Sequence, residues 1–153
     1  MIEFKKAQKE QVEELTQISK AAFDTDIEVG ADEVGGPPDY DSVKWHEKMQ
    51  KQGNLYAFSN NGKLVGGAIL FQDRKDKHVV YVGRIFIAPQ YHRQGLGIEM
   101  MKHIQQNFLG VQVLRLETPV WNVRTNAFYN KCGFQEMFRN QESVYFEKTW
   151  GDK

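Results

Sequence analysis

The segment from Pro89 to Ile98 constrains the fold of this chain more than any other stretch of similar length. It follows an apolar run, residues 79–87, and leads into an amphipathic run, residues 98–109. A strand that ends at a proline, turns through two glycines and enters a helix leaves backbone N–H groups unpaired at the helix N-terminus. Because these donors and the helix dipole point the same way, the sequence predicts a phosphate or pyrophosphate site there. A tight strand-to-helix link without a ligand is the alternative.

Two other phosphate-binding patterns do not fit this loop. The dinucleotide fingerprint needs a third glycine three places after the second, but Gly95 and Gly97 are followed by Ile98, Glu99 and Met100. The P-loop needs four residues between its glycines and then Lys-Ser or Lys-Thr, which is also absent. If the loop binds a phosphate, it therefore does so as a third type of phosphate site.

Composition limits the class of protein. A chain of 153 residues with 41% hydrophobic and 26% charged residues predicts one ordinary globular domain, residues 1–153. A net charge of zero argues against nucleic-acid binding, and no apolar run reaches the length of a membrane span. The single cysteine, Cys132, excludes an internal disulfide, and the four histidines lack metal-ligand spacing. We expect a cytoplasmic protein with no metal, no nucleic-acid partner and no membrane association.

Hydrophobic periodicity and turn residues predict an α+β protein with a mixed sheet. Asn61-Gly62 between two apolar runs is a strong hairpin signal, and a second hairpin is expected near the C-terminus. Residues 24–40 are rich in glycine and proline and predict a long loop. The expected strands are 2–7, 55–59, 64–71, 79–87, 111–117, 134–139 and 143–148, and the expected helices are 12–22, 42–52, 98–108 and 125–131.

Two segments together resemble the GNAT family of acetyl-CoA-dependent N-acetyltransferases. The family signature, Arg/Gln-x-x-Gly-x-Gly/Ala, is similar to His92-Arg93-Gln94-Gly95-Leu96-Gly97, with His92 as the departure. The segment from Trp121 to Phe134 is similar to the family's asparagine-to-tyrosine segment, which ends in Gly-Phe. The resemblance implies a mostly antiparallel central sheet of about seven strands flanked by four helices. In that fold the fourth and fifth strands splay apart, aided by a bulge.

The resemblance also implies acetyl-CoA as the cosubstrate. Its pyrophosphate would be held by the glycine loop, and its pantetheine arm would pair with the fourth strand as an added strand. A backbone N–H near Ile87 would stabilise the negative charge that develops on the thioester oxygen. The cofactor-binding residues implied in this way are Phe86, Ile87, Ala88, His92, Arg93, Gln94, Gly95, Leu96, Gly97, Ile98, Asn122 and Asn126.

Two catalytic residues follow from the same resemblance. Tyr129 is expected to donate a proton to the departing thiolate, and Glu117 is expected to act as the general base for the amine, through water. Each has a structural alternative. Tyr129 could simply pack beside Phe128, and Glu117 could pair with Arg115 or Arg124. Asn122 could cap the helix that follows it, and a capping role is compatible with cofactor binding. We expect Cys132 to be a buried, inert thiol.

The acceptor is less well defined by the sequence. The acidic loop after the first helix, with Asp24, Asp26 and Glu28, predicts a primary amine of a small molecule or peptide, although such a loop can also be merely solvated. A non-catalytic acyl-CoA sensor or interaction module on the same fold is the alternative function. The last strand, with Val144, Tyr145 and Phe146, is expected to be exposed and could support a homodimer.

Overall fold

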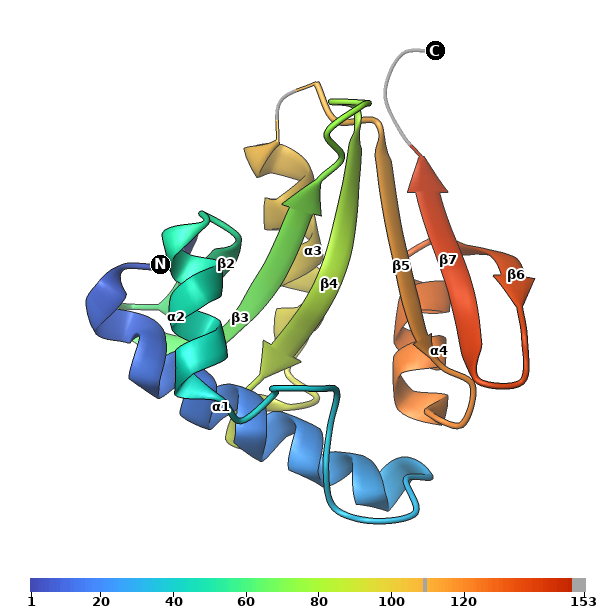
Figure 1. Ribbon diagram of the computed structural model, residues 1–153, viewed down its shortest axis with the longest axis horizontal. Helices are drawn as coiled ribbons and strands as arrows, with labels where there is room; N and C mark the ends of the chain where they lie inside the picture. Colours follow the sequence, from blue (N-terminus) through green and yellow to red (C-terminus); the bar gives the residue numbers. More distant parts are fainter. Residues whose placement is uncertain (109, 150–153) are drawn as a thin grey trace.

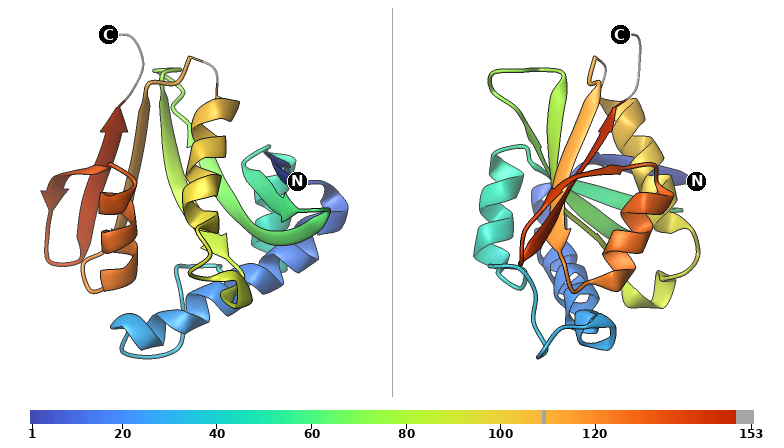
Figure 2. Two further views of the ribbon diagram at one scale, coloured as in Figure 1. Left: turned by 180° about the vertical axis from the view of Figure 1, so that it is seen from behind. Right: turned by 90° about the vertical axis from the view of Figure 1, so that its right-hand side faces the viewer.

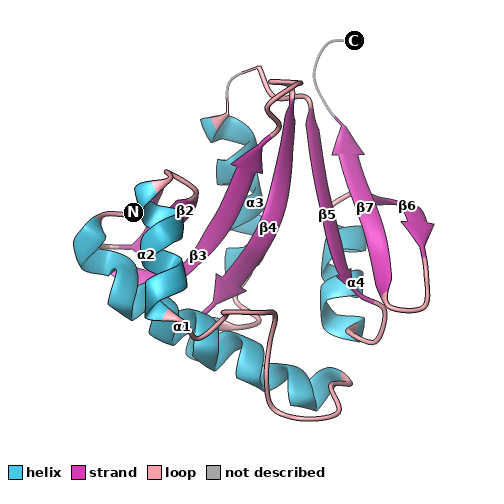
Figure 3. Ribbon diagram, in the orientation of Figure 1, coloured by secondary structure: helices cyan, strands magenta, loops and turns pink. Residues whose placement is uncertain are grey.

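The computed structural model describes residues 1–108 and 110–149, and its seven strands form one mixed sheet in the order β1-β2-β3-β4-β5-β7-β6. The predicted α+β architecture is confirmed (Figures 1 and 3). The strands are β1 (Ile2–Lys6), β2 (Leu55–Asn60), β3 (Lys63–Gln72), β4 (Val79–Ile87), β5 (Val113–Pro119), β6 (Gln135–Arg139) and β7 (Ser143–Thr149). The helices are α1 (Val12–Asp24), α2 (Val43–Lys51), α3 (Leu96–Asn107) and α4 (Val123–Lys131).

The helices cover both faces of the sheet. Helices α3 and α4 lie on one face, and α1 and α2 lie on the other (Figure 2). One apolar core, which includes Ile104, Leu114 and Tyr129, fills the α3 and α4 side. A second core, which includes Leu15 and Phe86, fills the α1 and α2 side. Both faces are therefore closed by apolar packing, as an amphipathic helix on a sheet requires.

Local sequence signals fix several boundaries. Asn61 and Gly62 adopt φ values of 53° and 81°, which are the positive angles that a two-residue hairpin turn needs. The Ser42 hydroxyl accepts a hydrogen bond from the Trp45 N–H at 3.0 Å and so caps α2. Gly133, with φ of 91°, follows the last turn of α4 as predicted. These turns and caps form where the sequence places them because each depends on neighbouring residues only.

Strands β4 and β5 are parallel but pair over only three residue positions, from Val79 opposite Val113 to Tyr81 opposite Arg115. Beyond that point they diverge, so the predicted splay is confirmed (Figure 1). A bulge lies in β4 at Gly83, because Arg84 pairs with Ile69 of β3 whereas Val82 pairs with the next residue, Leu70. The separation leaves backbone groups of both strands without a strand partner.

The bulge reverses which side chains of β4 face each helical layer. Before it, Val80 and Val82 contribute to the core under α3. After it, Ile85 and Ile87 pack against that core, and Phe86 joins the core under α1 and α2. An extra residue shifts the two-residue alternation by one, so Arg84 shares the α1 and α2 side with Phe86.

Two predictions at the edges differ from the structure. Residues 24–40 are not wholly irregular, because α1 continues to Asp24 and a 3-10 turn follows at Thr25–Val29. The last strand is not the edge of the sheet, since β7 lies between β5 and β6 with Val144 and Phe146 buried. The hairpin pattern does not reveal which of its two strands joins the sheet, and here the apolar strand β7 does so while every residue of β6 is exposed.

Candidate active site

A cavity of about 570 Å³ lies at the open end of β4 and β5. Its walls come from three parts of the chain: the segment between α1 and α2, the bulged part of β4, and the end of β5 with the start of α4. In Figure 1 the segment between α1 and α2 passes below this open end of the sheet. The ionisable side chains of its lining are Asp26, Asp32, Glu33, Arg84, Glu117 and Tyr129.

Tyr129 contributes a buried phenol to this cavity. Its ring packs among Phe128, Phe134 and Phe146, with centroid distances of 5.3, 5.6 and 5.9 Å. The side chain is 8% exposed, and among the described residues its hydroxyl has no hydrogen-bond partner. Burial raises the pKa of Tyr129 above its ordinary value, with a smaller contribution from Cys132. The ring therefore packs as the structural alternative requires, while the protonated hydroxyl remains available to a ligand.

Glu117 lines the same cavity from β5. The alternation along β5 buries Leu116 and Thr118 and leaves Glu117 exposed on the opposite face. The proposed pairing with Arg115 or Arg124 is not found, because Arg115 contacts Glu147 at 3.5 Å and Arg124 contacts Asp26 at 3.1 Å. Within residues 1–108 and 110–149, Glu117 has no ion-pair partner, so its carboxylate is available to a ligand or to water.

Asn122 is almost fully buried, at 2% exposure, and caps α4. Its side-chain oxygen accepts a hydrogen bond from the Thr125 N–H at 3.0 Å. The capping alternative is therefore confirmed. Asn126 donates to the carbonyl oxygens of Pro119 and Asn122 at 3.0 and 2.8 Å. These bonds shape the β5–α4 turn beside the cavity, and cofactor contacts by either asparagine remain a prediction.

On β4 the backbone of Ile87 faces the β5 side. The Ala88 N–H donates to the Val65 carbonyl of β3 at 2.8 Å, and hydrogen-bonded positions alternate along an antiparallel pair. Phe86 and Ala88 therefore direct their backbone groups to β3, which differs from the prediction that all three residues pair with the cofactor arm. Ile87, together with Ile85, points its N–H and C=O away from β3.

The His92 side chain closes onto this strand end. Its Nε2 lies 2.7 Å from the Ile87 carbonyl oxygen, so a proton on Nε2 makes a hydrogen bond there. His92, the residue that departs from the family signature, thus contacts one of the two backbone groups of Ile87 that point away from β3. The Ile87 N–H remains for an added strand or a carbonyl oxygen.

The loop turns into α3 at Gly95 as predicted, but the helix begins at Leu96, earlier than the expected Ile98, so Gly97 lies inside the helix. Gly95 has φ of 77° and precedes the first residue of α3, and Arg93 also has a positive φ, 65°. The N–H groups of Leu96, Gly97 and Ile98 find no acceptor among the described residues, so they fit an anionic group. Glycine suits these two positions for different reasons: Gly95 has a positive φ, and Gly97 packs closely against α4. A Cβ at Gly95 would meet nothing within 4 Å, whereas one at Gly97 would lie 2.9 Å from the Phe128 ring of α4.

Of the three predicted acceptor-binding acids, only Asp26 lines the cavity. Asp24 is held by Lys20 at 2.5 Å and by the Tyr40 hydroxyl at 2.7 Å, and these bonds lower its pKa. Glu28 is exposed and is not among the lining residues. Asp32 and Glu33 line the cavity instead. The acidic character predicted for this loop is therefore carried by a partly different set of side chains.

Asp26 also ties the end of α1 to α4. It is 8% exposed, and its carboxylate accepts a hydrogen bond from the Arg124 guanidinium at 3.1 Å. The same guanidinium nitrogen donates to the Thr25 hydroxyl at 2.7 Å. Burial raises the pKa of Asp26, and Arg124, Asn122 and His92 act in the opposite direction. This contact joins residues 98 positions apart on the two sides of the open sheet end.

Replacing Arg124 with glutamine should leave the Asp26 carboxylate buried without its cation. We expect the free energy of unfolding at neutral pH to fall by about 1 kcal/mol, less than for a fully buried pair because the Arg124 side chain is 39% exposed. The loss should disappear as the pH falls through the raised pKa of Asp26 toward the ordinary 3.8, because a protonated carboxyl needs no cation. Urea unfolding at several pH values measures both effects.

Arg139→Gln is the matched control, since Arg139 pairs with Glu136 on the exposed strand β6. It should leave unfolding unchanged. A pH-independent loss in the Arg124 variant would mean that packing, not charge pairing, stabilises this contact.

Arg84 also lines the cavity, and the sequence interpretation missed it. It is the one cationic side chain among the described lining residues. The available signal was a glycine and an arginine, Gly83-Arg84, inside an otherwise apolar strand. Such an interruption is typical of a bulge that redirects a side chain.

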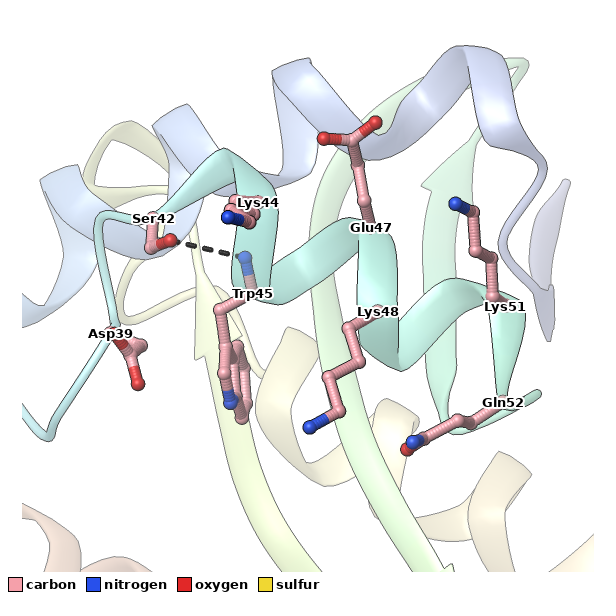
Figure 4. Close-up of a pocket in the computed structure, with 8 residues that line it drawn as sticks. All are labelled: Asp39, Ser42, Lys44, Trp45, Glu47, Lys48, Lys51 and Gln52. Atoms are coloured by element: carbon pink, nitrogen blue, oxygen red, sulfur yellow. Dashed lines mark hydrogen bonds between the residues drawn. The ribbon is translucent and has the colours of Figure 1, made fainter.

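A second hollow, of about 670 Å³, lies over the outer side of α2 (Figure 4). It is lined by Lys44, Lys48 and Lys51 together with Trp45, and it shares no residue with the cavity at β4 and β5. Across the described ranges no helix is long and apolar enough to cross a membrane. The same residues contain no cluster of histidine, cysteine and acidic side chains able to hold a metal ion.

The fold is shared with known acetyltransferase structures. The PaiA N-acetyltransferase from Thermoplasma acidophilum, solved in complex with coenzyme A, superposes with a TM-score of 0.79 over 98% of this chain and 99% of that chain. The two sequences are 17% identical, so this likeness concerns the fold.

Curated relatives are more similar in sequence over shorter stretches. An uncharacterized protein of Bacillus subtilis, YrkN, is 32% identical over 81 residues, which cover 52% of this chain and 43% of that protein. The Escherichia coli enzyme [Ribosomal protein bS18]-alanine N-acetyltransferase is 33% identical over 99 residues, which cover 60% of this chain and 65% of that protein. The matches thus span less than two thirds of either relative. The Acetyltransferase (GNAT) family profile matches residues 12–134, from α1 through α4. This chain therefore belongs to the GNAT acetyltransferase family.

Proposed function

We propose that this protein is an N-acetyltransferase that moves an acetyl group from acetyl-CoA to a primary amine of a small molecule or peptide, by direct attack in a ternary complex. The observation that carries the proposal is that Glu117 and Tyr129, from β5 and α4, line one cavity and are both without a partner among the described residues. Membership of the GNAT family and the coenzyme A complex of the PaiA relative support acetyl-CoA as the donor.

The residues present fit the donor. The open N–H groups at the start of α3 suit its pyrophosphate, and the Ile87 backbone suits the amides of its pantetheine arm. When bound, acetyl-CoA supplies the acetyl group as a thioester. Because β4 and β5 separate beyond Tyr81, an arm paired with Ile87 would run toward the cavity that holds Glu117 and Tyr129.

Each catalytic residue then has one task. Glu117 accepts, through water, the proton that the attacking amine must lose before its nitrogen can form the new C–N bond. The Ile87 N–H donates to the carbonyl oxygen, which gains negative charge during the attack. Tyr129 donates its proton to the sulfur as the C–S bond breaks, and burial favours the protonated phenol. The nitrogen loses its second proton as it becomes the amide nitrogen, and this proton, carried by water, restores the phenol. Holding both partners in one cavity supplies further acceleration through proximity.

The lining favours an amine acceptor. Asp26, Asp32, Glu33 and Glu117 give the cavity an acidic wall, which attracts ammonium groups. The relative from Escherichia coli is named for acetylation of an alanine of ribosomal protein bS18, which supports a peptide N-terminus as one candidate acceptor.

An acetyl-CoA consumption assay over a panel of amines tests the proposal. The panel contains amino acids, alaninamide, short peptides with free N-termini, spermidine and an aminoglycoside. We expect coenzyme A release and an acetylated product, identified by mass spectrometry, for at least one of them. Saturable acetyl-CoA binding without turnover of any amine would instead indicate a non-catalytic acyl-CoA sensor.

A further inference from the structure

Arg84 stands at the β4 wall of the cavity because of the bulge at Gly83. Without the extra residue, the alternation of β4 would turn this side chain toward α3. A side chain at Gly83 itself would meet the Phe71 ring at 2.8 Å, so the bulge occupies a position where glycine fits. The bulge lies just beyond Tyr81, the last β4 residue that pairs with β5, and it brings a cation to the wall of the cavity.

The guanidinium is held in place from two directions. Its Cζ lies 4.2 Å from the centre of the Trp45 ring of α2, a cation–π contact, and its Nη2 donates to the Pro38 carbonyl oxygen. Trp45 also lines the hollow over α2, and its side chain extends away from the first turn of that helix (Figure 4). A stacked guanidinium keeps a fixed plane, which suits recognition of a carbonyl or carboxylate.

One nitrogen of this group is unsatisfied. The Arg84 Nη1 is buried and has no hydrogen-bond partner among the described residues. No carboxylate forms an ion pair with Arg84 within the described part of the chain. An unpaired donor on a buried charged group is costly. Because Nη1 is closed to solvent in the unliganded protein, an oxygen of a ligand in the cavity satisfies it only after a small shift of the Arg84 side chain.

We propose that Arg84 determines acceptor specificity by binding a carbonyl or carboxylate oxygen that lies a few bonds from the nucleophilic amine. This inference rests on the proposed acetyltransferase function and narrows its substrate class. The carboxylates of the cavity attract the ammonium group, and Arg84 selects among amines for those that carry such an oxygen. Amino acids, their amides and peptide N-termini have this pattern, whereas polyamines and simple alkylamines do not.

Alaninamide and isopropylamine form a matched pair of acceptors. They differ in that a methyl group of isopropylamine replaces the carboxamide. Comparing Arg84→Ala with the wild type on each amine separately removes the effect of their different amine pKa values. We expect Arg84→Ala to raise KM for alaninamide by roughly tenfold, as for loss of one charge-assisted hydrogen bond, and to change KM for isopropylamine less than about twofold. If one of the amines is not acetylated, its inhibition constant is measured with alaninamide as the substrate and is used in place of KM.

Further variants separate recognition from folding. Arg84→Gln keeps a neutral hydrogen-bond donor, so its KM for alaninamide should lie between those of the wild type and Arg84→Ala. The glutamine variant also tests the proposal if Arg84→Ala does not fold. Arg115→Ala removes a positive charge from β5 outside the cavity and should leave KM for both amines unchanged. Thermal unfolding and acetyl-CoA binding report on the fold and the cofactor site in every variant.

The outcomes are distinct. An equal loss on both amines, no loss on either, or a wild-type preference for isopropylamine or spermidine over alaninamide would overturn the role of Arg84 while leaving the acetyltransferase proposal intact. If the wild type acetylates none of the amines in the panel, the proposed function fails and this inference fails with it.

Discussion

Replacing Tyr129 with phenylalanine is expected to lower kcat at least about 100-fold, the low end of what a general acid contributes. The change removes only the hydroxyl, so the packing of the ring against Phe128, Phe134 and Phe146 remains. KM for acetyl-CoA and the thermal unfolding temperature should therefore change little. Steady-state kinetics with a saturating acceptor measures the effect.

The pH dependence sharpens this prediction. Because burial raises the pKa of Tyr129, the phenol stays protonated throughout the neutral range, and its own ionisation should not limit kcat below pH 10. Tyr56→Phe is the matched control, since Tyr56 is also 8% exposed and belongs to the same core but does not line the cavity. Equal turnover by Tyr129→Phe and the wild type across the pH range would remove Tyr129 as the acid.

The second large effect is expected for Glu117→Gln. Kcat/KM at neutral pH should fall about 100-fold, because the acceptor amine is protonated there and must lose a proton before attack. The loss should shrink as the pH rises past the pKa of the acceptor amine, since the free base then needs no catalyst for deprotonation. A pH profile of kcat/KM for both proteins measures this convergence.

Glu147→Gln provides the comparison for Glu117. Glu147 lies on the neighbouring strand β7, pairs with Arg115 and does not line the cavity, so its neutralisation should leave kcat/KM unchanged. A loss in Glu117→Gln that is the same at every pH would assign Glu117 to binding of the acceptor instead of proton transfer.

Much of the site could be predicted from the sequence because it is built from local geometry. The amides at the start of α3 are open because β4, the turn at Gly95 and α3 follow one another directly along the chain. The cap formed by Asn122 needs only the N–H of Thr125, three positions away. The family resemblance then assigned Glu117 and Tyr129 to positions that the structure brings to one cavity.

The contacts that no local pattern reveals are those between distant segments. Arg124 and Asp26 are 98 positions apart, and no pattern in either segment predicts that the two side chains pair. The separation of Asp24 and Glu28 from the cavity likewise depends on where α1 ends and which way the 3-10 turn runs. The hairpin of β6 and β7 was predicted, but the choice of β7 as the inner strand depends on which strand buries its apolar side chains against β5.

The sequence by itself determined the order of elements and the turn at Gly95, because turns, caps and helix ends depend on residues close along the chain. The two candidate catalytic side chains, Glu117 and Tyr129, came from the family resemblance. Only the tertiary structure decided that Arg84 faces the cavity. That outcome follows from one bulge at Gly83, which shifts the alternation of β4 by a residue and forms through pairing with β3. A side chain's direction on a strand depends on its register with a neighbour, and register is a property of the assembled sheet.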